Sequence, residues 1–137
     1  MSFVWDGSLA VGHDGIDSDH EHLILLAARA EAAVVDKKDD ITIAEVFVDL
    51  AEYTMSHFQR EEQFMLRSHY PKLAEHKAMH DTLLSELSML IDRAELHPGE
   101  IDQEVVAFLH HWVKDHIMTW DQALANHLSE QGYAEAV

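Results

Sequence analysis

The sequence contains no cysteine, so disulfides, thiolate metal sites and thiol nucleophiles are all excluded. Glycine occurs five times and proline twice in 137 residues, which favours a compact helical protein over a disordered one. No apolar run approaches the roughly 18 residues that a membrane span needs. The first residues, MSFVWDGSLAVG, lack the basic and apolar segments of a signal peptide. We therefore expect one soluble, cytoplasmic domain.

Basic residues are also scarce. The chain has 9 of them against 26 acidic residues, for a formal charge of −17. Such a field repels the phosphates of nucleic acids and anionic membranes, so we expect neither as a main partner. The same field attracts cations to the surface.

Apolar side chains, by contrast, are plentiful at 47% of the residues, and their spacing predicts an all-α fold. An N-terminal arm of residues 1–17 precedes four amphipathic helices joined by short loops, which favours an antiparallel up-down-up-down four-helix bundle. We expect Asp17 or Ser18 to cap the first helix and Pro71 to open the third. The predicted single domain covers residues 1–137, with helices at about 18–36, 41–67, 71–96 and 101–129.

Histidine is the residue in excess, with 12 copies and no terminal run of the kind that a purification tag leaves. Each predicted helix interrupts its apolar stripe with residues that can bind a metal. Residues four apart lie about 40° apart around a helix, so both can reach one ion. In an antiparallel bundle their positions also place them at similar heights. The set is His20 from the first helix, His57 and Glu61 from the second, His76 and His80 from the third, and His116 and Asp121 from the fourth.

The number of donor atoms predicts how many ions this set holds. Five imidazoles and two bridging carboxylates offer about nine donor atoms, too many for one ion but suited to two first-row metals of about six ligands each. With a solvent-derived oxygen bridging the two ions, one position stays open. A site with an open position can bind a small molecule, whereas a structural site closes its coordination sphere.

His116 and Asp121 are separated by five residues, which on a regular α-helix places them about 140° apart. A local π-type widening of the helix would bring both side chains to one side, and such widenings occur at functional sites. We therefore predict a π-helical segment near residues 116–121.

Four segments together resemble the hemerythrin family, in particular its single-domain bacterial members: VGHDGIDSDH, HFQREEQFM, HKAMH and WVKDHIMTWD. The resemblance runs from about Trp5 to Leu128. It implies a four-helix bundle with a non-haem di-iron centre that binds O2 reversibly. The cofactor would be two iron ions, cycling between Fe2+ and Fe3+, with a bridging oxo or hydroxo ligand.

The resemblance also implies a role for each residue. His76, His80 and His116 would hold one iron, His20 and His57 would hold the other, which keeps the open position, and Glu61 and Asp121 would bridge the two. An apolar O2 pocket would be lined by Leu23, Phe58, Trp112, Val113 and Ile117. The chain departs from the usual pattern at Val113, where leucine is more common, at His13, where an apolar residue is usual, and at the pair His110–His111.

Other interpretations remain open. The same metals would serve an enzyme acting on peroxide or NO, and zinc or manganese would make the bundle a structural or metal-storage protein. A metal-free core with satisfied histidines is disfavoured, since the apolar stripes offer few partners for buried polar groups. We assign His22, His69, His97 and His127 to the surface, Glu62 to an exposed position or to one supporting a ligand, and His110 and His111 mostly to the surface.

Overall fold

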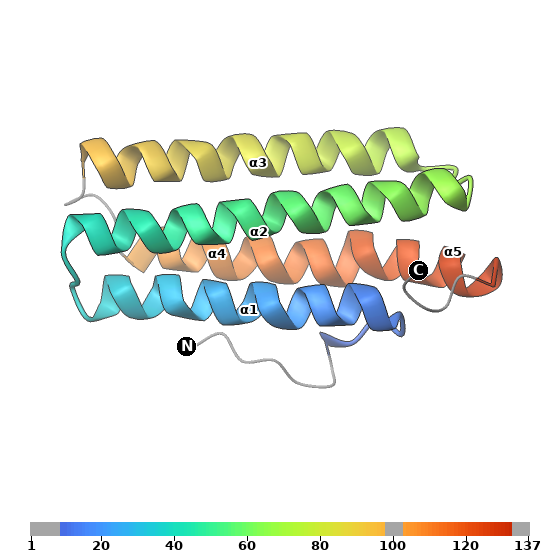
Figure 1. Ribbon diagram of the computed structural model, residues 1–137, viewed down its shortest axis with the longest axis horizontal. Helices are drawn as coiled ribbons and strands as arrows, with labels where there is room; N and C mark the ends of the chain where they lie inside the picture. Colours follow the sequence, from blue (N-terminus) through green and yellow to red (C-terminus); the bar gives the residue numbers. More distant parts are fainter. Residues whose placement is uncertain (1–8, 98–102, 133–137) are drawn as a thin grey trace.

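The computed structural model describes residues 9–97 and 103–132. Within these ranges the chain forms helices and no strand, and the predicted all-α up-down-up-down bundle is confirmed (Figure 1). The helices are α1 (Asp14–Val35), α2 (Asp40–Arg67), α3 (Leu73–Leu96), α4 (Gln103–Asp115), the π-helix η3 (His116–Asp121) and α5 (Gln122–Glu130). The last three follow one another without a break and together form the fourth rod of the bundle.

The start of α1 differs from the prediction. The helix begins at Asp14, and its N-cap is His13, whose Nδ1 accepts a hydrogen bond from the backbone N–H of Ile16 at 3.2 Å. Asp17 does not cap the helix because its carboxylate accepts from the backbone N–H groups of Val11 and Gly12, at 2.7 and 3.2 Å. The predicted caps Asp17 and Ser18 were therefore wrong, and the arm ends at His13.

The other boundaries follow ordinary capping chemistry. Asp39 caps α2 by accepting from the N–H of Thr42 at 2.8 Å. Pro71 lies in the turn before α3, which begins at Leu73, two residues later than predicted. The predicted start of the fourth helix, at residue 101, lies outside the described residues.

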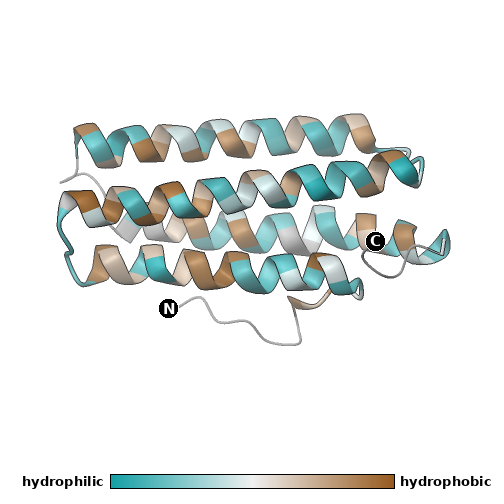
Figure 2. Cartoon of the chain, in the orientation of Figure 1, coloured by the Kyte–Doolittle hydropathy of each residue, from teal (hydrophilic) through white to brown (hydrophobic). Residues whose placement is uncertain are grey.

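The core changes character along the bundle. Near the end where α1 connects to α2, the interior is apolar, and six of its side chains are completely buried: Ala27, Ala30, Phe47, Leu50, Ala94 and Leu109. Towards the end where α2 connects to α3, histidines and carboxylates are buried beside apolar side chains such as Met65 and Leu124. Figure 2 shows polar and apolar residues mixed along every helix, as amphipathic helices require. None of the described helices is long and apolar enough to cross a membrane.

Candidate metal centre

The structure brings the seven predicted metal-binding side chains together inside the bundle. None of them is more than 3% exposed. Their ligand atoms form two groups, and within each group the atoms lie within 4.8 Å of one another. Glu61 and Asp121 belong to both groups. The first adds His20, His57 and His116, and the second adds His76 and His80.

Asp121 faces the histidines with both of its oxygens. Its Oδ2 lies 2.6 Å from Nε2 of His20, 2.8 Å from Nε2 of His116 and 3.2 Å from Nε2 of His57. Its Oδ1 lies 3.2 Å from Nε2 of His76. The two oxygens therefore point to different sides of the cluster, as a bridging carboxylate requires.

Glu61 is placed in the same way. Its Oε1 lies 3.0 Å from Nε2 of His80 and 3.5 Å from Nε2 of His76, while its Oε2 lies 3.4 Å from Nε2 of His57. Each carboxylate thus spans the space between two sets of imidazole nitrogens. This geometry suits two ions that share both carboxylates.

His116 lies between the two sets. Its Nε2 is 2.8 Å from Oδ2 of Asp121, on the side of His20 and His57, and 3.9 Å from Oε1 of Glu61, on the side of His80. By distance it groups with His20 and His57, whereas the resemblance pairs it with His76 and His80. The assignment of His116 to one ion stays a prediction.

The predicted π-helix is confirmed at His116–Asp121, the six residues HIMTWD. In a π-helix the hydrogen bonds run from residue i to i+5, so residues five apart come to lie on the same side of the helix. This is why both His116 and Asp121 point into the cluster although the α-helical pattern would separate them.

Buried charge dominates the electrostatics of the centre. Burial, together with the nearby negative charge of Asp121, raises the pKa of Glu61 well above its usual value. Burial acts in the same direction on Asp121, but His116, His20 and His57 outweigh it and hold the pKa of Asp121 well below its usual value. For His57, burial is likewise outweighed, here by Asp121 and Asp19, and its pKa is raised.

The remaining imidazoles with a clear shift favour the neutral form that metals bind. Burial lowers the pKa of His20. Burial, helped by the neighbouring histidines His116 and His76, lowers the pKa of His80 to about 2. Burial lowers the pKa of His116 to about 4, in spite of the opposing charge of Asp121.

Several buried nitrogen and oxygen atoms of the cluster that could bind a metal have no hydrogen-bond partner among the described residues. They are Nε2 of His76, Nε2 of His116, Oε2 of Glu61 and Oδ1 of Asp121. Buried polar atoms are normally satisfied, so a group of such atoms facing one another needs a further binding partner. Nitrogen and oxygen donors converging in this number fit metal cations, and the residues present therefore fit a two-metal centre.

Asp19 is the main residue of the site that the sequence did not reveal. Its Oδ2 lies 2.9 Å from Nδ1 of His57, the ring nitrogen turned away from the cluster. Arg60 donates two hydrogen bonds to the same carboxylate, both at 2.8 Å, and Tyr53 donates one at 2.9 Å. Its position directly before His20 could have drawn attention to it, but neighbouring helical residues point about 100° apart and so predict no shared site.

Glu62 plays the matching part for His80. Its Oε2 lies 3.1 Å from Nδ1 of His80, and its Oε1 lies 3.6 Å from Nζ of Lys77. From the sequence we expected Glu62 either to be exposed or to support a metal-binding residue. Its contact with His80 favours the second possibility. The imidazoles of His57 and His80 thus each contact a carboxylate through Nδ1, the ring nitrogen that faces away from the cluster.

Part of the predicted O2 pocket lies against the cluster. The ring of Phe58 stacks on His80 with centroids 3.7 Å apart and lies 5.1 Å from His116, and the ring of Trp112 lies 6.5 Å from His116. Leu23 and Val113 are buried in the same core. The side chain of Ile117 lies outside the described residues.

The histidines outside the cluster have varied surroundings. His22, His69, His97 and His111 are exposed, and the half-buried His127 has its Nε2 3.0 Å from the carbonyl of Ser68. His110 was not predicted to be buried, yet its Nε2 lies 2.8 Å from Oε2 of Glu31 on α1, and both side chains are 11% exposed.

The fold and the site define a class: four-helix bundles that gather histidines and carboxylates into a buried cation-binding centre. Residues 11–128 match the sequence profile described as "Hemerythrin HHE cation binding domain". The chain therefore belongs to the hemerythrin family.

Individual relatives agree with this assignment. The chain is 32% identical to a bacteriohemerythrin of Clostridium acetobutylicum over 126 residues, which cover 88% of this chain and 96% of the relative. It is 29% identical to a myohemerythrin of Riftia pachyptila, with 84% of each chain covered. A crystal structure of wild-type hemerythrin superposes with a TM-score of 0.82 at 24% identity, covering 92% of this chain and 97% of the other, and so shows the same fold.

Proposed function

We propose that this protein binds O2 reversibly at a non-haem di-iron centre and serves in oxygen storage, delivery or sensing. The observation that carries the proposal is the pair of buried ligand groups that share Glu61 and Asp121. Two ions with shared carboxylates and a majority of imidazole ligands match the centre that the hemerythrin resemblance implies. The relatives' names, bacteriohemerythrin and myohemerythrin, support the same function.

In this proposal the chain supplies an asymmetric set of ligands. His76, His80 and His116 would hold one ion, His20 and His57 would hold the other, and Glu61 and Asp121 would be shared by both. The ion with fewer histidines would be the one able to bind O2. When bound, two ferrous ions would supply the electrons that O2 accepts reversibly.

The apolar residues around the centre keep water away from it. Phe58 and Trp112 are 1% and 5% exposed and lie against His80 and His116. A lining of this kind admits a neutral diatomic molecule and slows the entry of water and ions. We propose Leu23, Val113 and Ile117 as further parts of this lining.

The visible spectrum of the iron-loaded protein tests the proposal. Anaerobically reduced protein should gain a charge-transfer band when O2 is added and lose it when O2 is removed, over repeated cycles. Irreversible conversion to the ferric form, or sustained turnover with added peroxide or NO, would show an enzyme instead. Metal analysis that finds zinc or manganese and no iron would show a structural or storage protein.

The ligand balance favours binding over turnover. Di-iron oxidases of the ferritin-like type use more carboxylates and fewer histidines than this cluster of five histidines and two carboxylates. We propose that any peroxidase-type activity is a weak side reaction. We further propose that the protein is cytoplasmic, and the charge of −17 supports the absence of nucleic acids and anionic membranes among its main partners.

A further inference from the structure

A polar network on the outer side of the metal centre contacts one of its ligands. It consists of Asp19 on α1 and of Tyr53 and Arg60 on α2. Oδ2 of Asp19 accepts from Nδ1 of His57 at 2.9 Å and from Nε of Arg60 at 2.8 Å. Oδ1 accepts from the hydroxyl of Tyr53 at 2.9 Å and from Nη2 of Arg60 at 2.8 Å.

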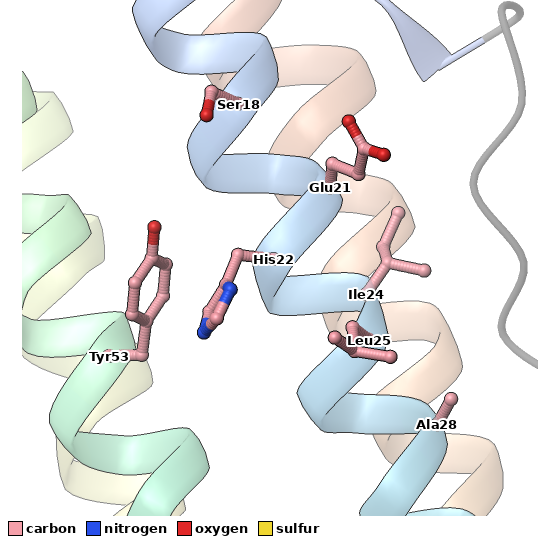
Figure 3. Close-up of a pocket in the computed structure, with 7 residues that line it drawn as sticks. All are labelled: Ser18, Glu21, His22, Ile24, Leu25, Ala28 and Tyr53. Atoms are coloured by element: carbon pink, nitrogen blue, oxygen red, sulfur yellow. The ribbon is translucent and has the colours of Figure 1, made fainter.

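Arg60 and Tyr53 are themselves held together, so the network behaves as a unit. The guanidinium carbon of Arg60 lies 5.4 Å from the centroid of the Tyr53 ring, within the range of a cation–π contact. Figure 3 shows the hydroxyl of Tyr53 directed towards the turn of α1 that carries Ser18, with His22 beside the ring. Burial and the bond to Asp19 raise the pKa of Tyr53 to about 12, so the phenol remains a donor at neutral pH.

The other four imidazoles of the cluster differ from His57 at their outer nitrogen. Nδ1 of His80 meets Glu62, which is 23% exposed. Nδ1 of His20, His76 and His116 is buried without a hydrogen-bond partner among the described residues. Of the two carboxylates that contact an outer imidazole nitrogen among the described residues, Asp19 beside His57 is the less exposed to solvent, at 12%.

A carboxylate bonded to the outer N–H of a metal-binding imidazole fixes the ring and makes its other nitrogen a stronger electron donor. Donors on that carboxylate act in the opposite sense, because they withdraw charge from it. Arg60 and Tyr53 together supply three such bonds to Asp19. A change at Arg60, whose side chain is 45% exposed, would therefore change how strongly Asp19 accepts the hydrogen bond from His57.

We propose that Asp19 is a positioning residue that orients His57 and, balanced by Arg60 and Tyr53, sets the reduction potential of the ion that His57 holds. This inference rests on the proposed function, because it takes the ions to be iron. A stronger donor stabilises the ferric state and lowers the potential. A weaker donor raises it.

The test is a set of variants with opposite expected signs. Asp19→Asn removes the anionic acceptor and should raise the midpoint potential of the iron pair. Arg60→Met and Tyr53→Phe leave Asp19 with fewer donors and should lower it, with the smaller shift for Tyr53→Phe, which changes no charge. Lys114→Met removes an exposed positive charge on α4 and serves as the control, with no shift expected.

If the network only supported the fold, the three substitutions would shift the midpoint potential in the same direction. If the potentials of Asp19→Asn and Arg60→Met move in the same direction, or if Tyr53→Phe behaves like the Lys114→Met control, the inference is overturned. If Asp19→Asn does not fold, the other two variants still test it, because both must lower the potential.

Zinc-loaded protein provides a measurement that needs no iron chemistry. The Nδ1–H proton of His57 should give a downfield NMR signal protected from exchange, and Asp19→Asn should move or lose it and weaken zinc binding roughly tenfold. An unchanged signal would contradict the contact. If wild-type protein fails to bind O2, the proposed function fails, whereas normal O2 binding with unchanged potentials in all variants refutes only this inference.

Discussion

The two ends of the bundle are built on different principles. At the end where α1 meets α2, side chains such as Phe47, Leu50 and Leu109 are fully buried, and apolar packing dominates a core that also holds the His110–Glu31 pair. At the other end, seven buried polar side chains face one another, and several of their atoms have no partner among the described residues. The apolar end thus supplies stability, whereas the other end holds a site whose remaining unpaired atoms need bound cations.

The largest expected effect is on metal and O2 binding, and it should be confined to the cluster. His57→Ala removes one of the two histidines proposed for the O2-binding ion and should abolish O2 binding. His111→Ala, a change of the same kind at an exposed position on α4, should leave it intact. Visible spectroscopy of iron-loaded protein measures both, and an equal loss in the two variants would refute the ligand assignment.

At the apolar end, the expected effect is on the free energy of unfolding. Leu50 is fully buried, and Leu50→Ala should cost about 2–5 kcal/mol through lost burial and the cavity that remains. The cost should be similar with and without metal, because Leu50 lies away from the cluster. Urea unfolding of both forms measures it, and a cost found only in the metal-loaded form would show that the two ends are not independent.

Metal uptake should depend on pH in a direction fixed by the cluster. The raised pKa values of His57 and Glu61 mean that the metal-free site carries protons that a cation must displace. Below pH 6.5, affinity for zinc should therefore rise with pH, by about tenfold per unit for each proton displaced. Calorimetry in buffers of different ionisation enthalpy measures the protons released, and uptake without release would contradict the shifts.

The smallest expected effect concerns the start of α1. His13→Ala removes the side chain that accepts from the N–H of Ile16 and should lower the free energy of unfolding by about 1 kcal/mol. His13→Asn keeps a capping acceptor and should lose less. Thermal unfolding compares the two, and equal losses would mean that packing of His13 against Phe64, rather than capping, is what matters.

Periodicity and spacing predicted much of this structure. The apolar stripes placed four antiparallel helices, and the five-residue separation of His116 and Asp121 predicted the π-helix found at His116–Asp121. These features depend on repeats within one helix, which the sequence displays directly.

The heights of the seven ligand residues on their helices also predicted that they meet in one cluster, but other contacts between helices were missed. The contacts of Asp19 arise because α1 and α2 pack with Asp19 facing His57 and Arg60, residues 38 and 41 positions away. The burial of His110 depends in the same way on Glu31, which lies 79 positions away on α1. The cap of α1 was missed for a different reason: Asp17 is the better N-cap by residue type, but its carboxylate already binds Val11 and Gly12.

The most direct test is anomalous diffraction from crystals of the iron-loaded protein, recorded on both sides of the iron absorption edge. We expect two iron peaks within the cluster, both adjoining Glu61 and Asp121, with His20 and His57 on one and His76 and His80 on the other. A single peak surrounded by a closed set of ligands, or iron bound elsewhere on the chain, would contradict this expectation.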